Sequence, residues 1–294
     1  MPSSGKSAQP KRRADEKTRP LPVSVERFFY FSLFVLVLLA PYHRGLYFRF
    51  ERLPFFLGIC SIGIALAAAR MRPRVPLSFA VAFILFVLLY GINIPFSANH
   101  GLAYQEFVNW GAYCLFFFLV ASLQTQPSPA VLFAFGANTV ILTFLGLLQG
   151  LRWIPEESYV LGMTLRAMFI DGRLYSTFQY PNTASAYFGM GYLALLGATL
   201  WEEHKEWFRF LASCLAFLAL AGVFFTYSRG GMLVLGLVLF ILLVVLPQRM
   251  RAGFLSGILV TALPFLILLP LLERFLHESK PLPFFGILSA GAIL

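Results

Sequence analysis

The chain has 294 residues, of which 59% are hydrophobic and only 12% are charged, and its mean hydropathy is +0.77. A water-soluble core cannot hide that much apolar surface, so the composition excludes a soluble globular protein and predicts an integral membrane protein. The formal charge of +10 comes from basic residues scattered between apolar runs. This pattern orients membrane spans and argues against a nucleic-acid partner. The three cysteines lie within apolar runs, which favours small buried side chains over a disulfide framework or a metal site.

The amino-terminal 24 residues are polar and basic, and we expect them to form a disordered cytoplasmic tail. The apolar run that follows, at 28–40, could be mistaken for the core of a signal peptide. Leu38 occupies the place where a cleavage site needs a small residue, and further apolar runs follow. We therefore interpret this run as an uncleaved membrane anchor.

Residues 25–272 are predicted to form an all-α, polytopic transmembrane bundle. A helix needs about 20 apolar residues to cross the hydrocarbon region of a bilayer. On that basis about nine apolar runs are long enough to serve as spans. They lie at 25–42, 53–69, 76–94, 107–123, 130–150, 182–201, 208–227, 231–246 and 254–272.

The distribution of Lys and Arg predicts the orientation of these spans. With the amino terminus inside, the inner segments carry 14 of these residues and the outer segments carry 9. This bias favours a cytoplasmic amino terminus. The outer face keeps several arginines, among them Arg152, Arg166, Arg173 and Arg229. Because arginine grips phosphate oxygens with a planar, always-charged fork, the cluster suggests an anionic lipid headgroup or a diphosphate. Alternatively, each arginine anchors a helix end at the membrane interface.

The outer segment at 151–181 is the longest loop of this topology. Its first half suits a turn that leads into a short interfacial helix at 165–170. Asp171 and Gly172 are then a strong turn signal. Residues 173–180 are expected to be extended, because Tyr180 precedes Pro181 and is pushed away from the helical region. Pro181 suits the first turn of the next helix.

Asn182, Ser185 and Gly189 follow at a spacing that places them on one face of that helix. A stripe of small and polar residues in a membrane helix either packs against another helix or lines a wet cavity. Other polar residues within spans, such as Asn138 and Gln149, allow the same two interpretations.

Residues 226–231, Thr-Tyr-Ser-Arg-Gly-Gly, join two apolar runs with no room for a conventional loop. Ser228 can cap the helix that follows, and the amino-terminal end of a helix carries partial positive charge and free N–H groups. Such an end, reinforced by Arg229, suits an anion. The alternative is a tight turn whose arginine marks the membrane surface.

Two motifs resemble the O-antigen ligase and O-antigen polymerase family of bacterial envelope glycosyltransferases. The first is Arg-Leu-Tyr-Ser-Thr-Phe-Gln-Tyr-Pro-Asn-Thr-Ala-Ser-Ala-Tyr at 173–187, and it is similar to the family's phenylalanine, proline-asparagine and small-residue helix start. The second is Thr-Tyr-Ser-Arg-Gly-Gly at 226–231, and it is similar to the family's serine-arginine-glycine signature. The resemblance covers roughly residues 107–272.

The resemblance implies a helical membrane glycosyltransferase that needs no metal or other cofactor. The enzyme would move a glycan from an undecaprenyl-diphosphate carrier to a lipid or polysaccharide acceptor at the outer face of the bacterial cytoplasmic membrane. Membrane lipids would be its other partners. Arg229 and Arg173 would hold the diphosphate, with Arg166 as a third candidate. Ser228, Asn182 and Tyr180 would complete the substrate-binding set.

The chain departs from the family pattern after residue 272. The family carries a large outer loop there, with a histidine thought to activate the acceptor hydroxyl, and then further spans. Here only 273–294 follow, which we expect to be an outer remnant whose final apolar run is too short to cross a bilayer. His277 is the candidate acceptor-activating base in that region. These features predict a truncated or fragmentary member, which could be inactive.

A different class of protein is also compatible with the sequence. The chain could be a transporter or flippase-like protein of polysaccharide export, or a lipid-binding membrane protein without catalytic activity. An ion-coupled carrier should place ionisable residues near the middle of the membrane, and the predicted spans contain essentially none. Binding of undecaprenyl diphosphate without glycan transfer would favour the binding protein.

Overall fold

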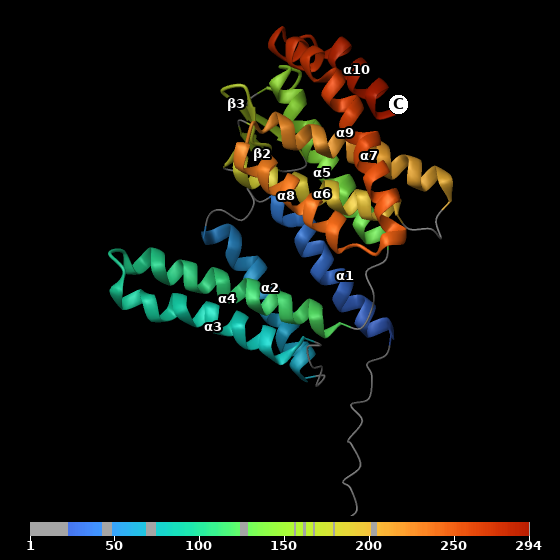
Figure 1. Ribbon diagram of the computed structural model, residues 1–294. Coiled ribbons are helices and arrows are strands. Elements are labelled where there is room, and N and C mark those ends of the chain that lie inside the picture. Colours follow the sequence, from blue (N-terminus) through green and yellow to red (C-terminus); the bar gives the residue numbers. More distant parts are fainter. Residues whose placement is uncertain are drawn as a thin grey trace, which may run out of the picture. The chain divides into compact units, whose positions relative to one another are not determined.

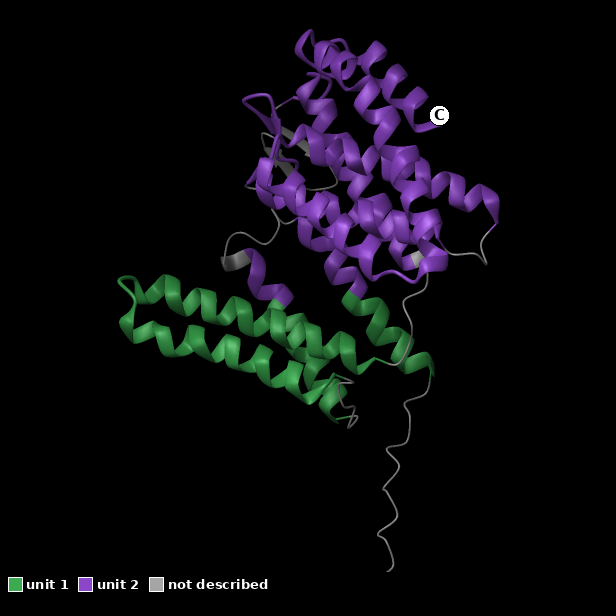
Figure 2. Cartoon of the chain, viewed as in Figure 1, with its two compact units in different colours: residues 1–33, 56–125 green, residues 34–55, 126–294 purple. Residues whose placement is uncertain are grey.

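The structure is a computed structural model, which describes residues 23–42, 49–68, 75–123, 129–155, 157–160, 163–166, 168–178, 180–200 and 205–293. The expected basic tail at 1–24 lies outside these residues, except for its last two. The described chain is almost entirely helical (Figure 1). It forms two compact units, which consist of residues 1–33 with 56–125 and of residues 34–55 with 126–294 (Figure 2).

The first unit is built on a helical hairpin of α3 (Leu77–Asn93) and α4 (His100–Ser122). The short 3-10 helix η2 (Ile94–Phe96) leads from one to the other. Helix α4 begins after Asn99, whose side chain accepts a hydrogen bond from the N–H of Leu102 at 3.1 Å and so caps the helix. Aromatic side chains hold the hairpin together through the ring pairs Phe79–Phe117, Phe83–Phe117, Phe86–Trp110 and Tyr90–Trp110.

Helices α1 (Val23–Leu39) and α2 (Arg49–Ala68) each contribute residues to both units, because the boundaries between the units fall within them. In the first unit they meet α4 in a small leucine cluster. This cluster consists of Leu33, Leu66, Leu119 and Leu123, all of them buried.

The second unit is organised around α6 (Pro181–Thr199), which buries 11 of its 19 residues. Helices α5 (Pro129–Gly150) and α7 (Glu206–Phe225) pack along it. Because neighbouring helices cover α6, it can carry the small and polar residues that a lipid-facing helix would avoid. Three further helices complete the unit: α8 (Arg229–Val245), α9 (Gln248–His277) and α10 (Pro281–Ile293).

A polar network centred on Asn138 lies inside this unit. Tyr42 donates a hydrogen bond from its Oη to Oδ1 of Asn138 at 2.6 Å. The amide nitrogen of Asn138 donates in turn to Tyr187 Oη at 2.9 Å and to the carbonyl oxygen of Leu38 at 3.3 Å. Asn138 was expected either to line a wet cavity or to contact a neighbouring helix. Its hydrogen bonds to residues of other helices confirm the second interpretation.

The helices fit an all-α, polytopic membrane protein, but the expected count of nine spans is not confirmed. Each of the nine predicted runs contains a helix. Helices α4 and α6 are long enough for a span but not apolar enough, and α8, with 17 residues, is about 25 Å long and so slightly short for the hydrocarbon region. Among the described residues, six helices are long and apolar enough to cross a membrane: Val23–Tyr42, Glu51–Ala68, Leu77–Phe96, Val131–Gly150, Glu206–Phe225 and Gln248–His277.

The prediction of an interfacial helix at 165–170 is wrong. Two short antiparallel hairpins occupy this part of the chain, one of β1 (Glu157–Val160) with β2 (Met163–Arg166) and one of β3 (Phe169–Ile170) with β4 (Arg173–Leu174). The cause is the two-residue turn at 171 and 172. Both residues are left-handed, with φ of 49° and 74°, and a turn of this kind joins paired strands and cannot extend a helix.

The extended conformation expected over 173–180 holds only in part. Strand β4 ends at Leu174, and the chain turns at Ser176, whose φ is 54°. Tyr180 is extended, with φ −135° and ψ 137°, and Pro181 stands at the start of α6, so both of these predictions are confirmed.

The described residues at 273–293 are mostly helical. Helix α9 continues for more than a turn beyond the predicted end of its span, to His277. Helix α10 then packs against α7 and α9, with Phe284 and Leu288 buried. The ring of Phe284 lies 5.8 Å from that of Phe225, between centroids. These residues therefore extend the second unit.

Candidate functional site

The 226–231 segment connects α7 to α8 through three residues whose side chains and backbone bond to one another. Thr226 donates from Oγ1 to the carbonyl oxygen of Val223 at 2.6 Å and accepts from the N–H of Ser228 at 3.2 Å. The Ser228 hydroxyl accepts from the N–H of Gly231 at 3.0 Å, so Ser228 is the predicted N-cap of α8. Tyr227 between them is left-handed, with φ of 48°, an uncommon conformation for a bulky residue that the surrounding contacts must hold.

Arg173 crosses from the β3–β4 hairpin to this segment. Its Nε donates to the carbonyl oxygen of Thr226 at 3.1 Å, and its Nη2 donates to the carbonyl oxygen of Tyr227 at 3.3 Å. These carbonyls follow the end of α7, where a cation is favoured. A guanidinium group has five N–H donors, so three remain for other partners. The expected proximity of the 171–182 and 226–231 segments is confirmed.

The amino-terminal end of α6 meets the same segment from another side. Ser228 Oγ donates to Oδ1 of Asn182 at 2.9 Å. One turn further along α6, Ser185 lies so close to Gly231 that a Cβ at Gly231 would overlap its hydroxyl. The Asn182–Ser185–Gly189 stripe therefore packs against α8. Of the two interpretations given for it, helix packing holds and a wet cavity does not.

Arg229 and Gly230 are the first two residues of α8, and both are exposed. Within the described part of the chain, no hydrogen bond or ion pair engages the Arg229 side chain or the backbone N–H groups of these two residues. Apart from its own turn of helix and its chain neighbours, no atom of the described residues lies within 4 Å of the place where a Cβ of Gly230 would stand. A helix end with free N–H groups, open space and a free guanidinium suits an oxygen-rich anion.

A carboxylate borders the segment on its α9 side. Tyr227 donates from its Oη to Oε1 of Glu273 at 2.8 Å. Partial burial raises the pKa of Tyr227, and the hydrogen bond to Glu273 and the negative charge of that group raise it further. His277 lies four residues after Glu273, at the end of α9, and its side chain is exposed. Because a helix repeats every 3.6 residues, Glu273 and His277 lie on the same face of α9.

The contacts described above do not test two of the sequence-predicted residues. Arg166 is the last residue of β2, and its side chain lies outside the described part of the structure. Tyr180 is exposed at the start of α6. Their proposed roles stay predictions.

Sequence reasoning missed the part played by Glu273, because hydropathy placed the end of the last span just before it. The spacing of four between Glu273 and His277 was the available signal, since it puts both on one face if the helix continues. The carbonyl oxygens of Thr226 and Tyr227 were missed as well, and no residue pattern identifies backbone acceptors. Among the described residues, no group of three or more His, Cys, Asp or Glu side chains could hold a metal ion.

Fold and site together define a class, namely a polytopic helical membrane protein that presents two arginines and an open helix end where α6, α7 and α8 meet. Comparison of the chain with protein-family models, curated proteins and solved structures finds no match.

Proposed function

We propose that the chain binds an undecaprenyl-diphosphate-linked glycan at the 226–231 segment and transfers the glycan to a lipid or polysaccharide acceptor. The arrangement of the two arginines is the observation that best supports this proposal. Arg173 is fixed against the backbone of Thr226 and Tyr227, while Arg229, at the exposed start of α8 a few residues away, has no partner among the described residues. The motif resemblance to O-antigen ligases and polymerases supports the same assignment.

The chemistry of such a transfer fits the charges of this site. The acceptor oxygen attacks the anomeric carbon of the glycan, the bond from that carbon to the diphosphate breaks, and the diphosphate leaves with added negative charge. Arg229 and the free N–H donors of Arg173 are suited to stabilise that charge, because they are in place before it develops. Helix α8 adds the backbone N–H groups of Arg229 and Gly230.

The proton of the acceptor hydroxyl needs a base. His277 is the proposed base, since it lies on the same face of α9 as Glu273, whose carboxylate is held by Tyr227. The proposed position of the site is the outer face of a bacterial cytoplasmic membrane, with the amino terminus in the cytoplasm. The excess of Lys and Arg in the segments assigned to the inner side supports this orientation.

Binding of undecaprenyl diphosphate to the purified chain in detergent tests the donor site. Arg229→Ala should weaken binding by about 10-fold to 100-fold, as expected for the loss of a charge-assisted contact. Arg173→Lys keeps the charge but cannot reach two carbonyl oxygens as a planar fork, so it should also weaken binding. Arg274→Ala is the matched control, because Arg274 is an exposed arginine at the end of α9 that pairs with Glu278.

A transfer assay with a lipid-linked glycan separates the two classes of function. We expect the parent chain to transfer the glycan. Arg229→Ala and Arg173→Ala should each abolish this transfer while leaving membrane insertion unchanged. Binding without transfer would assign the chain to non-catalytic lipid-binding or flippase-like proteins. Normal binding and transfer by both arginine variants would refute the site assignment.

A further inference from the structure

A polar cleft lies at the end of α7 opposite to the 226–231 segment. It has a volume of about 440 Å³ and opens between the last turn of α6 and the first turns of α7 and α9. Its walls carry Glu206 and Arg209 from α7 and Arg249 from α9. The candidate site at Thr226 is separated from Glu206 by the whole of α7, which is about 30 Å long and matches the hydrocarbon thickness. The cleft and the 226–231 segment therefore lie at opposite ends of a helix that is long enough to span the membrane.

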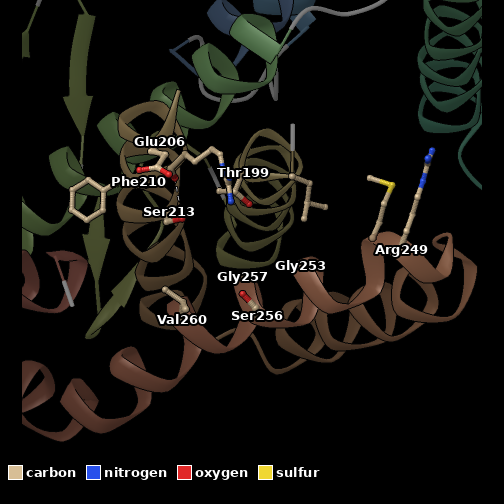
Figure 3. Close-up of a pocket in the computed structure, with 12 residues that line it drawn as sticks. Thr199, Glu206, Phe210, Ser213, Arg249, Gly253, Ser256, Gly257 and Val260 are labelled. Atoms are coloured by element: carbon tan, nitrogen blue, oxygen red, sulfur yellow. Dashed lines mark hydrogen bonds between the residues drawn. The ribbon is translucent and has the colours of Figure 1, made fainter. Parts of the chain in front are cut away.

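The cleft exists because one face of α9 carries mostly small side chains. Gly253, Ser256, Gly257 and Val260 are spaced three or four residues apart and line the floor beneath α6 and α7 (Figure 3). A Cβ at Gly257 would reach only ordinary contact with Leu196, whereas a Cβ at Gly253 would press lightly on the side chain of Leu200. The small residues leave an open volume between the helices.

The polar groups around this volume favour an anion. Within the described residues, neither Arg209 nor Arg249 forms an ion pair. The amino-terminal ends of α7 and α9 add partial positive charge. Glu206 is the one carboxylate among the described lining residues, and hydroxyl groups of Thr199, Ser213 and Ser256 provide hydrogen-bond partners. The described lining residues carry two arginines against this one carboxylate, and a positive balance suits a phosphate diester.

A mostly apolar cavity adjoins the cleft, and we refer to it as the apolar channel. It has a volume of about 120 Å³, shares Phe210, Ser213 and Val260 with the cleft, and lies between α7, α9 and the end of α10. Its other walls are mostly apolar: Cys214, Phe217, Thr261, Gly291, Ala292 and Ile293. A polar compartment that leads into an apolar one has the shape of an amphipathic ligand, with a charged head and a hydrocarbon tail.

We infer that this cleft binds an anionic glycerophospholipid, with its phosphate between Arg209 and Arg249 and the first part of one acyl chain in the apolar channel. The inference is independent of glycan transfer, because the cleft shares no residue with the candidate donor site. A lipid bound there would fill the gap between α7 and α9 at the membrane face opposite the 226–231 segment.

Native mass spectrometry of the delipidated chain in detergent tests this inference. Dioleoyl phosphatidylglycerol should be retained more strongly than dioleoyl phosphatidylcholine with the same acyl chains. Arg209→Gln and Arg249→Gln should each lower phosphatidylglycerol retention by about fivefold or more, as expected for a lost charge-assisted contact. Arg251→Gln is the matched control on α9, because its guanidinium donates to the carbonyl oxygens of Leu246 and Val244.

A variant that leaves every charge in place tests the apolar channel. Val260 lines both cavities and is half exposed, so Val260→Phe should fold and obstruct the junction between them. We expect it to lower phosphatidylglycerol retention. Equal retention of phosphatidylcholine, or normal retention by Val260→Phe, would overturn the inference. Binding of glycerol 3-phosphate as strong as that of phosphatidylglycerol would assign the cleft to a soluble phosphate and would also overturn it.

Discussion

Ser228 donates a hydrogen bond from its Oγ to Oδ1 of Asn182 at 2.9 Å, and it thereby ties the start of α8 to the first turn of α6. The same hydroxyl accepts from the N–H of Gly231. With an exposed fraction of only 1%, Ser228 is already engaged within the protein. Its role in the proposed site is therefore to position Arg229, and contact with a ligand falls to Arg229 itself.

Ser228→Ala should lower the stability of the second unit and weaken binding of undecaprenyl diphosphate. The cap and the link to Asn182 are both lost, and the loss of an N-cap alone costs about 1 kcal/mol. Thermal unfolding in detergent and the binding assay measure the two effects. Ser289→Ala, at an exposed serine of α10, is the control and should change neither donor binding nor the unfolding temperature. Unchanged stability of Ser228→Ala would show that the cap contributes nothing.

Gly231→Ala should destabilise the protein more than Gly230→Ala does. A Cβ at Gly231 would overlap Ser185, whereas a Cβ at Gly230 would meet open space. Overpacking of this kind costs about 1–3 kcal/mol. The double variant Gly231→Ala with Ser185→Gly removes the overlap and should recover part of the loss, which a double-mutant cycle of unfolding measurements would detect. Equal effects of the two single alanine variants would contradict the close approach of α6 and α8.

The contacts of these residues show what the sequence could and could not predict. The positions of the helices follow from the apolar runs, and the cap at Ser228 follows from its place before a helix. The pairing of the 171–182 and 226–231 segments follows from the order of the spans, which puts both at the same membrane face. The bonding partners of Arg173 do not follow, because they are carbonyl oxygens exposed only by the left-handed turn at Tyr227.

The failures also have local physical causes. The helix expected at 165–170 was lost to the hairpin that the Asp171–Gly172 turn closes, and a two-residue turn determines the conformation on both of its sides. The end of α9 was placed too early because hydropathy falls at Glu273, although charged residues continue a helix readily once it leaves the hydrocarbon. That error concealed the Tyr227–Glu273 contact.

Asn138→Ala should destabilise the second unit without any effect on the donor site. The substitution leaves the buried hydroxyl of Tyr187 and the hydroxyl of Tyr42 without their shared partner. An unpaired buried polar group costs about 1–3 kcal/mol. Thermal unfolding of Asn138→Ala should therefore begin at a lower temperature than that of the parent. Asn93→Ala is the control, because Asn93 is exposed at the end of α3 in the first unit.

If Tyr187→Phe is added to Asn138→Ala, one of the two hydroxyl groups that had lost Asn138 as a partner is removed. The double variant should then be less destabilised than the sum of the single variants predicts. Strict additivity would show that the hydrogen bond from Asn138 to Tyr187 does not contribute to stability.

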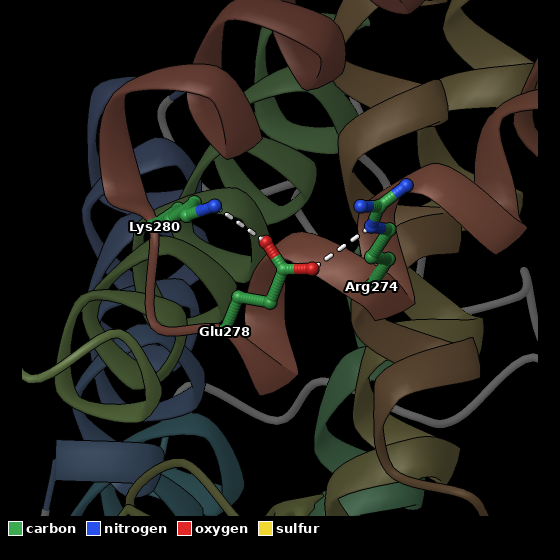
Figure 4. Close-up of polar contacts among 3 residues, drawn as sticks. All are labelled: Arg274, Glu278 and Lys280. Atoms are coloured by element: carbon green, nitrogen blue, oxygen red, sulfur yellow. Dashed lines mark hydrogen bonds and ion pairs between the residues drawn. The ribbon is translucent and has the colours of Figure 1, made fainter.

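The ion-pair cluster at the end of α9 should make stability depend on acid pH. Glu278 accepts from Arg274 Nε at 2.8 Å and from Lys280 Nζ at 2.7 Å (Figure 4). These hydrogen bonds, Arg274 first, lower the pKa of Glu278 from its ordinary value near 4.5 to about 2. The folded state therefore holds the proton of Glu278 less tightly than the unfolded state does. The ion pairs contribute fully to folding stability when the pH is above the ordinary pKa of Glu278, and this contribution is lost as the pH falls toward 2.

Glu278→Gln isolates this contribution, since it keeps the shape of the side chain and removes its charge. The parent should be more stable than the variant at about pH 6, and the difference should shrink when unfolding is measured at about pH 3. The cluster is exposed, so the difference should be small and should fall further in about 1 M salt. Glu106→Gln, at a carboxylate of α4 in the first unit, is the control for a general charge effect. A difference that is the same at both pH values would show that Glu278 does not carry the acid dependence.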